Sequence, residues 1–547
     1  MTLPKRRYLN RRRFRTGQPT GLKTILPDLS WFVKGKEYRG TRAPALQFGF
    51  MAFWLGLDVG TGGTRVLLVD ENGRVRHACT APHEDMRMER PGWAEQRPEN
   101  WWDGAREAIR GVLSQAKVSG QDVRGVGLSG QMHGLVVLDE TARVIRPALI
   151  WCDQRSQRQV DWINQIAGKE MVLHSTANPV LTGFTLPKLL WVRDNEPGLF
   201  ERVRRMLLPK DYIRFQLTGE FASDVSDASG TALFDVVQRR WALDLVDKLG
   251  LDRGILPRVY ESSEVAGKIT EVAARETGLA PGTPVVAGGG DQAASAVGNG
   301  VVTPGVVSCT LGTSGVVFAH SDQPSYDPAG RVHTFCHAVR GAWHVMGVTQ
   351  GAGLSLQWFR TQFVPGINYE ALTAEAAEAP AGSQGLYWLP YLMGERTPHL
   401  DAAARGGWIG LTARHTRADM IRALLEGVSY SQKDGLDIIE RMGVQVESVR
   451  VSGGGARSAF WRQMLADVFG KRVVTLETQE GSAYGAALLA LVGTGVYSSV
   501  PEVSKAVVRE VDSISPQPEA AQVYAAGHPV YKSLYPALQA FYGKADP

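Results

Sequence analysis

Two short turns rich in glycine and threonine are the first residues in the sequence that point to chemistry. Gly60-Thr61-Gly62-Gly63-Thr64 follows one apolar run, and Gly312-Thr313-Ser314-Gly315 follows another in the second half of the chain. Glycine allows a phosphate to approach the backbone, so that amide N–H groups and threonine hydroxyls can donate to its oxygens. One such turn alone could be a plain hairpin, but two matching turns favour a pair of phosphate-binding loops. Neither is a Walker A loop, because no Gly-Lys-Ser/Thr follows.

Two charged side chains accompany the first turn. Asp58 ends the apolar run before the turn, and Arg65 follows the turn. A carboxylate in that place could hold Mg²⁺, directly or through water, against a β- or γ-phosphate. Arg65 is the nearest cation and could reach a phosphate. The sequence therefore predicts a site for a metal ion and a polyphosphate.

A further carboxylate, Asp291, follows the buried strand Val285-Val286-Ala287 and the glycines Gly288-Gly289-Gly290, and it opens a helix of small residues. In α/β sheets, ligands bind at the carboxyl ends of the strands, which would make Asp291 a functional group. Aspartate is also a good helix N-cap. The spacing alone leaves both interpretations open.

Three more stretches are candidates for ligand contacts. Gln131-Met132-His133-Gly134 ends a strand, where the Met-His pair either packs or recognises a ligand. Trp151-Cys152-Asp153-Gln154-Arg155 offers an aromatic face and a charged pair suited to a polyol, or is a surface turn with an ion pair. Gly453-Gly454-Gly455 precedes a helix as in nucleotide-binding turns, although a single such turn is a weak signal.

The elements that would position these residues alternate between strands and helices. This alternation predicts an α/β fold with helices packed on sheet faces. The arrangement of strand, Gly-Thr turn and strand occurs twice, which indicates a duplication with a second domain starting near residue 302. The predicted strands are Phe53–Leu57, Arg65–Asp70, one after Glu71-Asn72-Gly73-Arg74, Val123–Leu128, Val306–Leu311, Val316–Ala319, Ser448–Ser452 and Arg472–Leu476, and the predicted helices are Trp101–Ala116, one with the apolar face Trp461, Met464, Leu465, Val468 and Phe469, and Gly485–Val492.

Length and composition agree with a two-domain globular enzyme. The chain has 547 residues, of which 44% are hydrophobic and 21% charged. This excludes collagen-like, coiled-coil and disordered classes, and it is too long for one core of the usual size. The four cysteines lie far apart without a Cys-x-x-Cys pair, so they predict neither a zinc site nor a disulfide framework and suit a reducing cytoplasm.

The basic charge is concentrated at the N-terminus. Residues 1–52 hold 12 of the 60 Lys and Arg but only 2 of the 55 Asp and Glu, which leaves the remainder with 48 basic and 53 acidic residues. The predicted folded part is therefore mildly acidic, and a nucleic-acid role would rest on the N-terminal segment alone. We expect no nucleic-acid partner.

Several interpretations of that N-terminal segment compete. It could be a polybasic arm or an organelle transit peptide, although Ser30 is its only serine. We expect instead that Met51 is the true start or that residues 1–50 are disordered. The uncharged run 43–57 is too short to span a membrane, so no transmembrane segment and no membrane partner are expected.

Two long motifs show a resemblance to a known family. Gly183-Phe184-Thr185-Leu186-Pro187-Lys188-Leu189-Leu190-Trp191-Val192-Arg193-Asp194-Asn195 is similar to the first signature of the FGGY carbohydrate kinases. Gly406-Gly407-Trp408-Ile409-Gly410-Leu411, with Asp419-Met420 and Ala423-Leu424-Leu425-Glu426, is similar to the second. The resemblance extends over roughly residues 53–540.

Other stretches resemble the branch of this family that phosphorylates xylulose. They are Gln131–Gly134 with Gly130, Leu208-Pro209-Lys210-Asp211-Tyr212, Ser223-Asp224-Val225-Ser226-Asp227 and Gly394-Glu395-Arg396-Thr397-Pro398-His399. Two positions depart from that branch. Gln292 stands where its members usually carry Asn and glycerol-phosphorylating relatives carry Gln, and Arg65 stands where a Lys is common.

The resemblance implies two ribonuclease H-like domains of the actin and hexokinase type around a cleft, residues 53–301 and 302–547. It implies ATP and Mg²⁺ as cofactors, a small sugar as substrate, a cytoplasmic location and compatibility with a homodimer. Asp291 would be the catalytic base, and Asp58 would lie at the metal. The sugar would contact Met132, His133, Trp151, Asp153, Asp291 and Gln292, and the phosphates and nucleotide would contact Thr61, Gly62, Gly63, Arg65, Gly312, Thr313, Gly353, Gln357, Gly453, Gly454 and Gly455.

The expected reaction is the ATP-dependent phosphorylation of D-xylulose to D-xylulose 5-phosphate. Three alternatives remain open. One is another FGGY kinase, acting on ribulose, glycerol, gluconate or a deoxy sugar. Another is a non-enzymatic nucleotide switch of the actin or Hsp70 type. The third is a binding protein that uses the basic arm and carries an inactive kinase fold.

Overall fold

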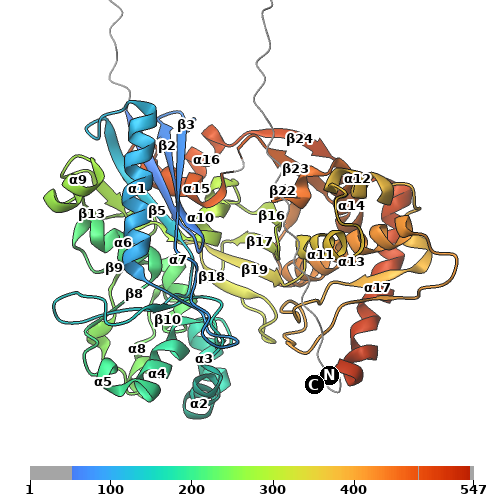
Figure 1. Cartoon of the computed structure of the whole chain (residues 1–547), viewed down its shortest axis with the longest axis horizontal. Helices are drawn as coiled ribbons and strands as arrows, with labels where there is room; N and C mark the ends of the chain where they lie inside the picture. The colour runs from blue at the N-terminus through green and yellow to red at the C-terminus, as the bar shows by residue number, and fades with distance from the viewer. Residues whose placement is uncertain (1–51, 479, 543–547) are drawn as a thin grey trace, which may run out of the picture. The chain divides into compact units, whose positions relative to one another are not determined.

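A computed structural model describes residues 52–478 and 480–542 (Figure 1). The predictions for Met51 and residues 1–50 lie outside the described residues. The alternation predicted from the sequence is confirmed, because two seven-stranded sheets carry helices packed on them.

The first sheet is built around β1 and β5, which are parallel, with β2 antiparallel to β1 on the other side. The short strand β15 pairs with β5 at its carboxyl end. The strands in sheet order are β13 (Val265–Lys268), β14 (Pro284–Val286), β5 (Val123–Gly130), β1 (Phe53–Val59), β2 (Gly63–Asp70) and β3 (Val75–Pro82), with β15 (Gly289–Gly290) beside β5.

The second sheet repeats this arrangement. Counted from β3 in the first sheet and from β19 in the second, the strand pairings follow the same order. Two antiparallel pairings are followed by two parallel pairings and then by one antiparallel pairing. The repeat predicted from the two Gly-Thr turns is thus confirmed at the level of topology. The strands in sheet order are β18 (His333–Cys336), β19 (Trp343–Thr349), β17 (Gly315–Ser321), β16 (Gly305–Leu311), β22 (Val446–Ser452), β23 (Arg472–Leu476) and β24 (Glu510–Ile514).

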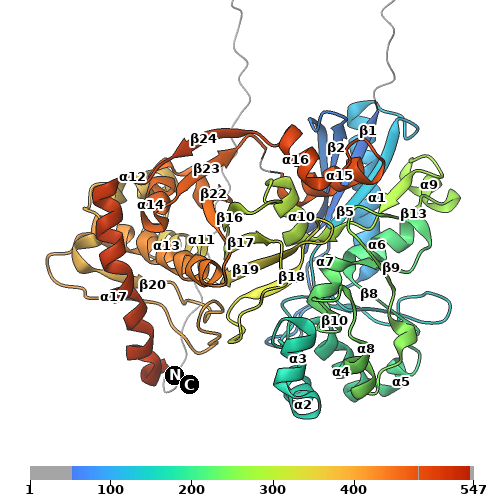
Figure 2. The same ribbon diagram turned by 180° about the vertical axis from the view of Figure 1, so that it is seen from behind.

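Helices α1 (Pro98–Ala116) and α15 (Gly481–Gly493) contact the first sheet, α1 against β2 and β3 and α15 against β1 and β5 (Figures 1 and 2). Helix α15 also packs on α10 (Asp291–Gly298), although the two are far apart in sequence. The approach of α15 is close enough to require glycine on the strand, because a Cβ at Gly56 would lie 1.9 Å from the carbonyl oxygen of Ala483. This packing brings the start of α15 to the end of β1.

Helices α13 (Arg417–Arg441) and α14 (Ala459–Phe469) pack on the second sheet. A capping box between Thr416 and Asp419 begins α13. The buried face of α14 contains the five apolar residues predicted from the sequence. No helix within the described ranges is both long enough and apolar enough to cross a membrane.

Further strands and helices complete the fold. The other strands are β4 (Glu95–Gln96), β6 (Val136–Leu138), β7 (Ala148–Leu149), β8 (Arg205–Leu207), β9 (Ala222–Asp224), β10 (Phe234–Asp235), β11 (Arg240–Trp241), β12 (Arg258–Tyr260), β20 (Tyr387–Leu389) and β21 (Gly407–Ile409). The other helices are α2 (Gln157–Ala167), α3 (Lys169–Thr176), α4 (Thr185–Asn195), α5 (Pro197–Phe200), α6 (Pro209–Thr218), α7 (Val225–Ala228), α8 (Leu243–Lys248), α9 (Glu271–Thr277), α11 (Gly353–Phe363), α12 (Tyr369–Ala376), α16 (Val500–Val507) and α17 (Pro518–Tyr542).

Candidate active site

The first Gly-Thr turn joins β1 to β2 and is tied to two other predicted stretches. The Thr61 hydroxyl donates to Oε1 of Gln131 at 3.1 Å and accepts from Nε1 of Trp151 at 3.1 Å. Nε2 of Gln96 donates to the Thr61 carbonyl oxygen at 2.8 Å. The structure thus brings the predicted phosphate loop, the strand end at Gln131 and the aromatic face of Trp151 together.

Asp58 lies at the end of β1 with one carboxylate oxygen free. Its Oδ2 accepts from the Ser482 hydroxyl at 2.6 Å, which the packing of α15 makes possible. Its Oδ1 is buried and has no hydrogen-bond partner among the described residues. Burial raises the pKa of this carboxyl, and the nearby hydroxyls of Ser482 and Ser129 partly offset that rise. A buried, unpaired carboxylate oxygen at the phosphate turn is suited to a cation.

Asp291 is the first residue of α10 and is partly buried. The N-cap is Gly290 and no side chain caps the helix, so the interpretation of Asp291 as an N-cap is wrong. Burial, together with the charge of Asp58, raises the pKa of Asp291 to about 7, while hydrogen bonds from Gln292 oppose the rise. Two carboxyls with different environments at one place are typical of catalytic acid–base sites.

His133 lies just beyond β5 in the left-handed region, with φ of 67°. Its Nδ1 is 2.7 Å from the Gly230 carbonyl oxygen, and its ring stacks on Phe184 with centroids 4.8 Å apart. Burial lowers the pKa of the imidazole to about 3, so it is neutral at pH 7. The neighbouring Met132 is buried. Both side chains are thereby held in one orientation.

The residues that hold His133 were not predicted from the sequence. The buried Lys188, in α4, donates from Nζ to the carbonyl oxygens of His133 at 2.9 Å and of Gly183 at 2.6 Å. The Thr185 hydroxyl donates to the same His133 carbonyl oxygen at 3.1 Å. Burial lowers the pKa of Lys188 to about 7. Both residues belong to the first family-like motif, but nothing in their local sequence indicates their partner.

Two predicted contact residues are engaged in ion pairs in this structure. Arg65 makes a bidentate pair with Glu480, at 2.6 and 2.7 Å, and donates to Thr80. Asp153 is fully buried, and its oxygens accept from Arg155 and from the Ala94 amide. Asp153 is therefore paired with Arg155, as the alternative of a turn with an ion pair expected. Direct contacts of Arg65 and Asp153 with a ligand stay predictions.

A second set of predicted residues lines a pocket of about 660 Å³ beside the second sheet. It brings together the second Gly-Thr turn, the start of α11 and the glycines after β22. A Cβ at Gly353 would lie 2.6 Å from the Gly312 carbonyl oxygen. Gly453 has a φ of 86°, and a Cβ there would lie 2.6 Å from the Leu311 carbonyl oxygen. The pocket residues include Gly312, Thr313, Gly353, Gln357, Gly454 and Gly455, which were predicted, and Asn368, Tyr369, Arg457, Ser458 and Trp461, which were not.

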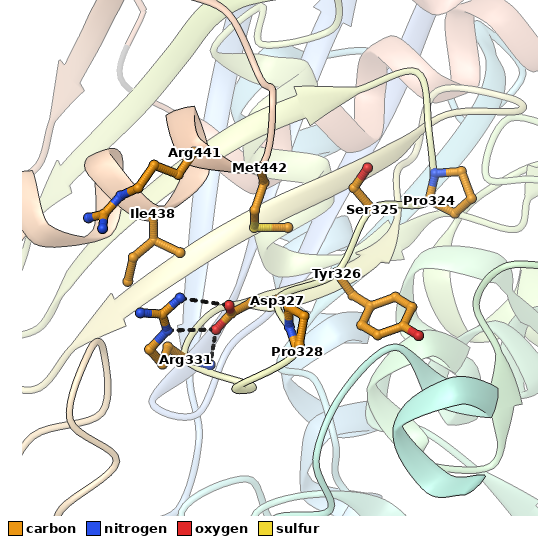
Figure 3. A pocket seen from close by; sticks show the side chains of 9 residues that line it. All are labelled: Pro324, Ser325, Tyr326, Asp327, Pro328, Arg331, Ile438, Arg441 and Met442. Atoms are coloured by element: carbon orange, nitrogen blue, oxygen red, sulfur yellow. Dashed lines mark hydrogen bonds and ion pairs between the residues drawn. The ribbon is translucent and has the colours of Figure 1, made fainter. Parts of the chain in front are cut away.

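Another cavity, of about 480 Å³, has none of the predicted residues in its lining. Figure 3 shows Asp327 and Arg331 of its lining paired with each other, and the ion pair is 2.8 Å long. The Arg331 carbonyl oxygen also accepts from Thr397. These charges satisfy each other, so the cavity is not a candidate catalytic site.

Comparisons with known proteins agree with this arrangement. The N-terminal domain of the FGGY family of carbohydrate kinases matches residues 53–298, and the C-terminal domain of that family matches residues 307–494. Xylulose kinase of Escherichia coli (strain K12) is 40% identical, and that of Bacillus subtilis (strain 168) is 39% identical. Each match covers 89% of this chain, with 99% and 97% of the respective relative.

The fold also matches that of a solved structure. The xylulose kinase of Rhodospirillum rubrum is 32% identical and superposes with a TM-score of 0.84, over 89% of this chain and 99% of that protein. The family matches span most of the chain, and they include the two turns, Asp58, Asp291 and the glycines of the pocket. This chain therefore belongs to the FGGY family of carbohydrate kinases.

Proposed function

We propose that this protein transfers the γ-phosphoryl group of ATP to the terminal C5 hydroxyl of D-xylulose, giving D-xylulose 5-phosphate and ADP. The observation that carries the reaction is Asp291, a partly buried carboxyl beside Asp58 whose pKa is raised to about 7. The relatives named xylulose kinase, at 39 and 40% identity over nearly their whole length, support the choice of sugar.

Asp291 acts as the general base. As the C5 oxygen forms a bond to the γ-phosphorus, the bond from that phosphorus to the β–γ bridging oxygen breaks, and the hydroxyl proton passes to the Asp291 carboxylate. A base with a pKa close to the working pH accepts a proton efficiently while still being ionised in a large fraction of molecules. Most of the remaining acceleration comes from positioning and charge stabilisation, as in phosphoryl transfer generally.

Asp58 fits a role in holding Mg²⁺, the ion that the free Oδ1 and its place beside the phosphate turn suggest. Magnesium prefers oxygen ligands and is often held by one or two carboxylates together with phosphate oxygens. When bound, the ion would neutralise phosphate charge. The described residues contain no group of three or more His, Cys, Asp and Glu side chains suited to a metal, which agrees with a site completed by the nucleotide.

The sugar and the nucleotide occupy different parts of the site in this proposal. Met132, His133, Trp151, Asp291 and Gln292 contact the sugar. The 660 Å³ pocket takes the nucleotide, with its phosphates reaching the two Gly-Thr turns. Residues 53–301 and 302–547 form the two domains around them, and closure on the sugar excludes water from the reacting phosphate. The four free cysteines suit a reducing cytoplasm.

A panel of acceptors tests the choice of sugar. ADP release by the full chain is measured with Mg-ATP and each of D-xylulose, D-ribulose, glycerol and gluconate. We expect kcat/KM to be highest for D-xylulose. A higher value for another acceptor would replace the sugar and keep the mechanism, whereas no stimulation by any acceptor would favour a nucleotide switch.

Replacing Lys188 with methionine is expected to raise the sugar KM about tenfold or more. The His133 carbonyl loses the Lys188 Nζ donor at 2.9 Å, so the left-handed backbone that aims the imidazole is less well fixed. The nucleotide KM should change less than twofold, since Lys188 does not line that pocket. Thr185→Val, which removes a single and longer hydrogen bond to the same carbonyl, should have a smaller effect. Equal changes in both KM values would contradict this role.

Replacing Gly353 with alanine is expected to raise the KM for ATP about tenfold or more. The new Cβ would lie 2.6 Å from the Gly312 carbonyl oxygen and displace the second phosphate turn. Gly407→Ala is the matched control, since nothing lies within 4 Å of a Cβ there. Steady-state kinetics at saturating sugar measures both. A Gly353→Ala enzyme with the wild-type KM for ATP would exclude this nucleotide site.

The rate should fall on acidification because the base must be ionised. With a pKa of about 7 for Asp291, kcat/KM for sugar decreases about tenfold for each pH unit below that pKa. Mg²⁺ at Asp58 would offset the effect of the Asp58 charge on the pKa of Asp291. The apparent pKa of the rate should therefore lie at or below 7 with saturating Mg²⁺ and rise when Mg²⁺ is limiting. A pH profile of kcat/KM that is flat between pH 5 and 8 at both saturating and limiting Mg²⁺ would argue against Asp291 as the base.

A further inference from the structure

Two sequence stretches that the proposed function leaves without a role meet in one buried cluster. Lys210 and Asp211 come from the start of α6, and Asp224 and Asp227 flank the start of α7. Nζ of Lys210 lies 2.6 Å from Oδ1 of Asp211, 2.9 Å from Oδ1 of Asp224 and 3.4 Å from Oδ2 of Asp227. Arg214 joins Asp211 at 3.1 Å, and all five side chains are fully buried.

A buried group of five ionisable side chains is weak evidence for stability, because desolvation offsets much of the attraction between charges. Its contacts outside the cluster therefore matter more. Nη1 of Arg214 donates to the carbonyl oxygen of Ala287 at 2.8 Å, just after β14. Oδ2 of Asp224 accepts from the Ser226 amide at 2.8 Å and from the Ser226 hydroxyl at 2.6 Å. The cluster thus reaches toward the segment that ends at Asp291.

Ser226 makes the direct link to that segment. Its Oγ accepts the backbone N–H of Gly290 at 3.1 Å, one residue before Asp291. Since the single hydroxyl proton of Ser226 is donated to Asp224, its oxygen is left to act as the acceptor. Nζ of Lys210 lies against the other oxygen of Asp224, Oδ1, so that Oδ2 is left to accept the Ser226 hydroxyl and the Ser226 oxygen to accept the Gly290 amide.

Two further contacts hold Gly290. β15, which consists of Gly289 and Gly290, pairs with Ser129 and Gly130 of β5. A Cβ at Gly290 would lie 2.9 Å from Cγ of Met132, so that residue packs directly against the backbone. Gly290 is thus held by β5 and Met132 and also by Ser226, which accepts the N–H of the Gly289–Gly290 peptide.

We propose that Lys210, Asp224 and Ser226 form a positioning relay that holds the Gly290 amide and thereby aims the Asp291 carboxylate at the acceptor hydroxyl. This inference rests on the proposed function, in which Asp291 is the base. Positioning is effective because displacing a reacting group by about 1 Å can cost on the order of 10²-fold in rate. None of the three residues touches the substrate in this account.

Ser226→Ala and Ser262→Ala are a matched pair for the test. Both hydroxyls are buried and both donate to Oδ2 of Asp224, Ser262 at 2.9 Å, but only the Ser226 hydroxyl contacts Gly290. In the full chain, Ser226→Ala should lower kcat about tenfold or more with the KM for ATP within twofold of wild type. Ser262→Ala should keep kcat within about twofold. Equal kcat values for the two variants, or a Ser226→Ala effect confined to KM, would overturn the proposal.

Hydrogen–deuterium exchange gives a second readout that does not depend on turnover. The peptide containing Gly290 should exchange faster in Ser226→Ala than in wild type and should be unchanged in Ser262→Ala. Unchanged exchange in both would overturn the relay even if kcat fell. If wild-type protein shows no sugar-dependent ADP release, the proposed function is wrong and the catalytic role of the relay is wrong with it. An exchange difference would then still identify the Ser226 hydrogen bond.

Discussion

Replacing Asp291 with asparagine is expected to lower kcat for sugar-dependent ADP release by about 10²–10⁴-fold, the usual contribution of a general base. The amide keeps the size of the side chain at the start of α10 but cannot take the C5 proton. Because Asp291 does not line the 660 Å³ pocket, the KM for ATP should stay within about threefold. Steady-state kinetics at saturating D-xylulose measures both constants. A variant that retains more than about a tenth of wild-type kcat would contradict the assignment of the base.

Thermal unfolding of the same variant is the control for folding. The pKa of Asp291 is raised in the folded protein, so its ionised form opposes folding fully above pH 7, and this cost disappears below the unfolded pKa of about 4. Asparagine carries no charge at any pH. We therefore expect the melting temperature of Asp291→Asn at pH 8 to equal or exceed that of wild type, with the difference shrinking as the pH falls toward 4. Lost activity together with a lower melting temperature at pH 8 would indicate misfolding instead.

Replacing Asp58 with asparagine is expected to lower kcat by about 10²-fold or more and to weaken the response to Mg²⁺. The substitution removes the carboxylate whose Oδ1 is buried and unpaired beside the phosphate turn, and an amide is a much poorer ligand for a divalent cation. Titration of kcat with MgCl₂ at fixed ATP measures the effect, and the half-saturating Mg²⁺ concentration should rise.

Ser482→Ala is the matched control for Asp58→Asn. It removes the 2.6 Å hydrogen bond to Oδ2 and leaves the charge in place, so the loss in kcat should be less than about tenfold. An Asp58→Asn enzyme with the Mg²⁺ dependence of wild type would show that the metal is held elsewhere.

The local fold could be predicted well from the sequence. Glycine turns, apolar runs and one amphipathic helix each signal structure within a few residues, and the predicted strands around both Gly-Thr turns are confirmed as β1, β2, β16 and β17. The repeated topology was signalled by the two turns alone. Local patterns of this kind depend on neighbours in sequence, which the sequence displays directly.

Long-range partners could not be predicted in the same way. Glu480 pairs with Arg65 and Ser482 bonds Asp58 only because α15 packs on the first sheet, more than 400 residues along the chain. Lys188 looks like a surface lysine beside a proline, yet it is buried under His133. A charged residue has no local pattern that tells whether its partner is water, a ligand or a distant side chain. That is why Asp153, predicted to contact sugar, is found paired with Arg155.

Asp291, in the proposed function, enables transfer of a phosphoryl group from ATP to D-xylulose. Phosphorus NMR of a reaction with the full chain, Mg-ATP and D-xylulose tests it most directly, run in parallel with Asp291→Asn. We predict that the wild-type reaction accumulates ADP and a phosphomonoester coupled to the C5 protons of the sugar in equal amounts, and that the variant forms neither at a comparable rate. Inorganic phosphate without a sugar phosphate, or equal product formation by the variant, would contradict the account.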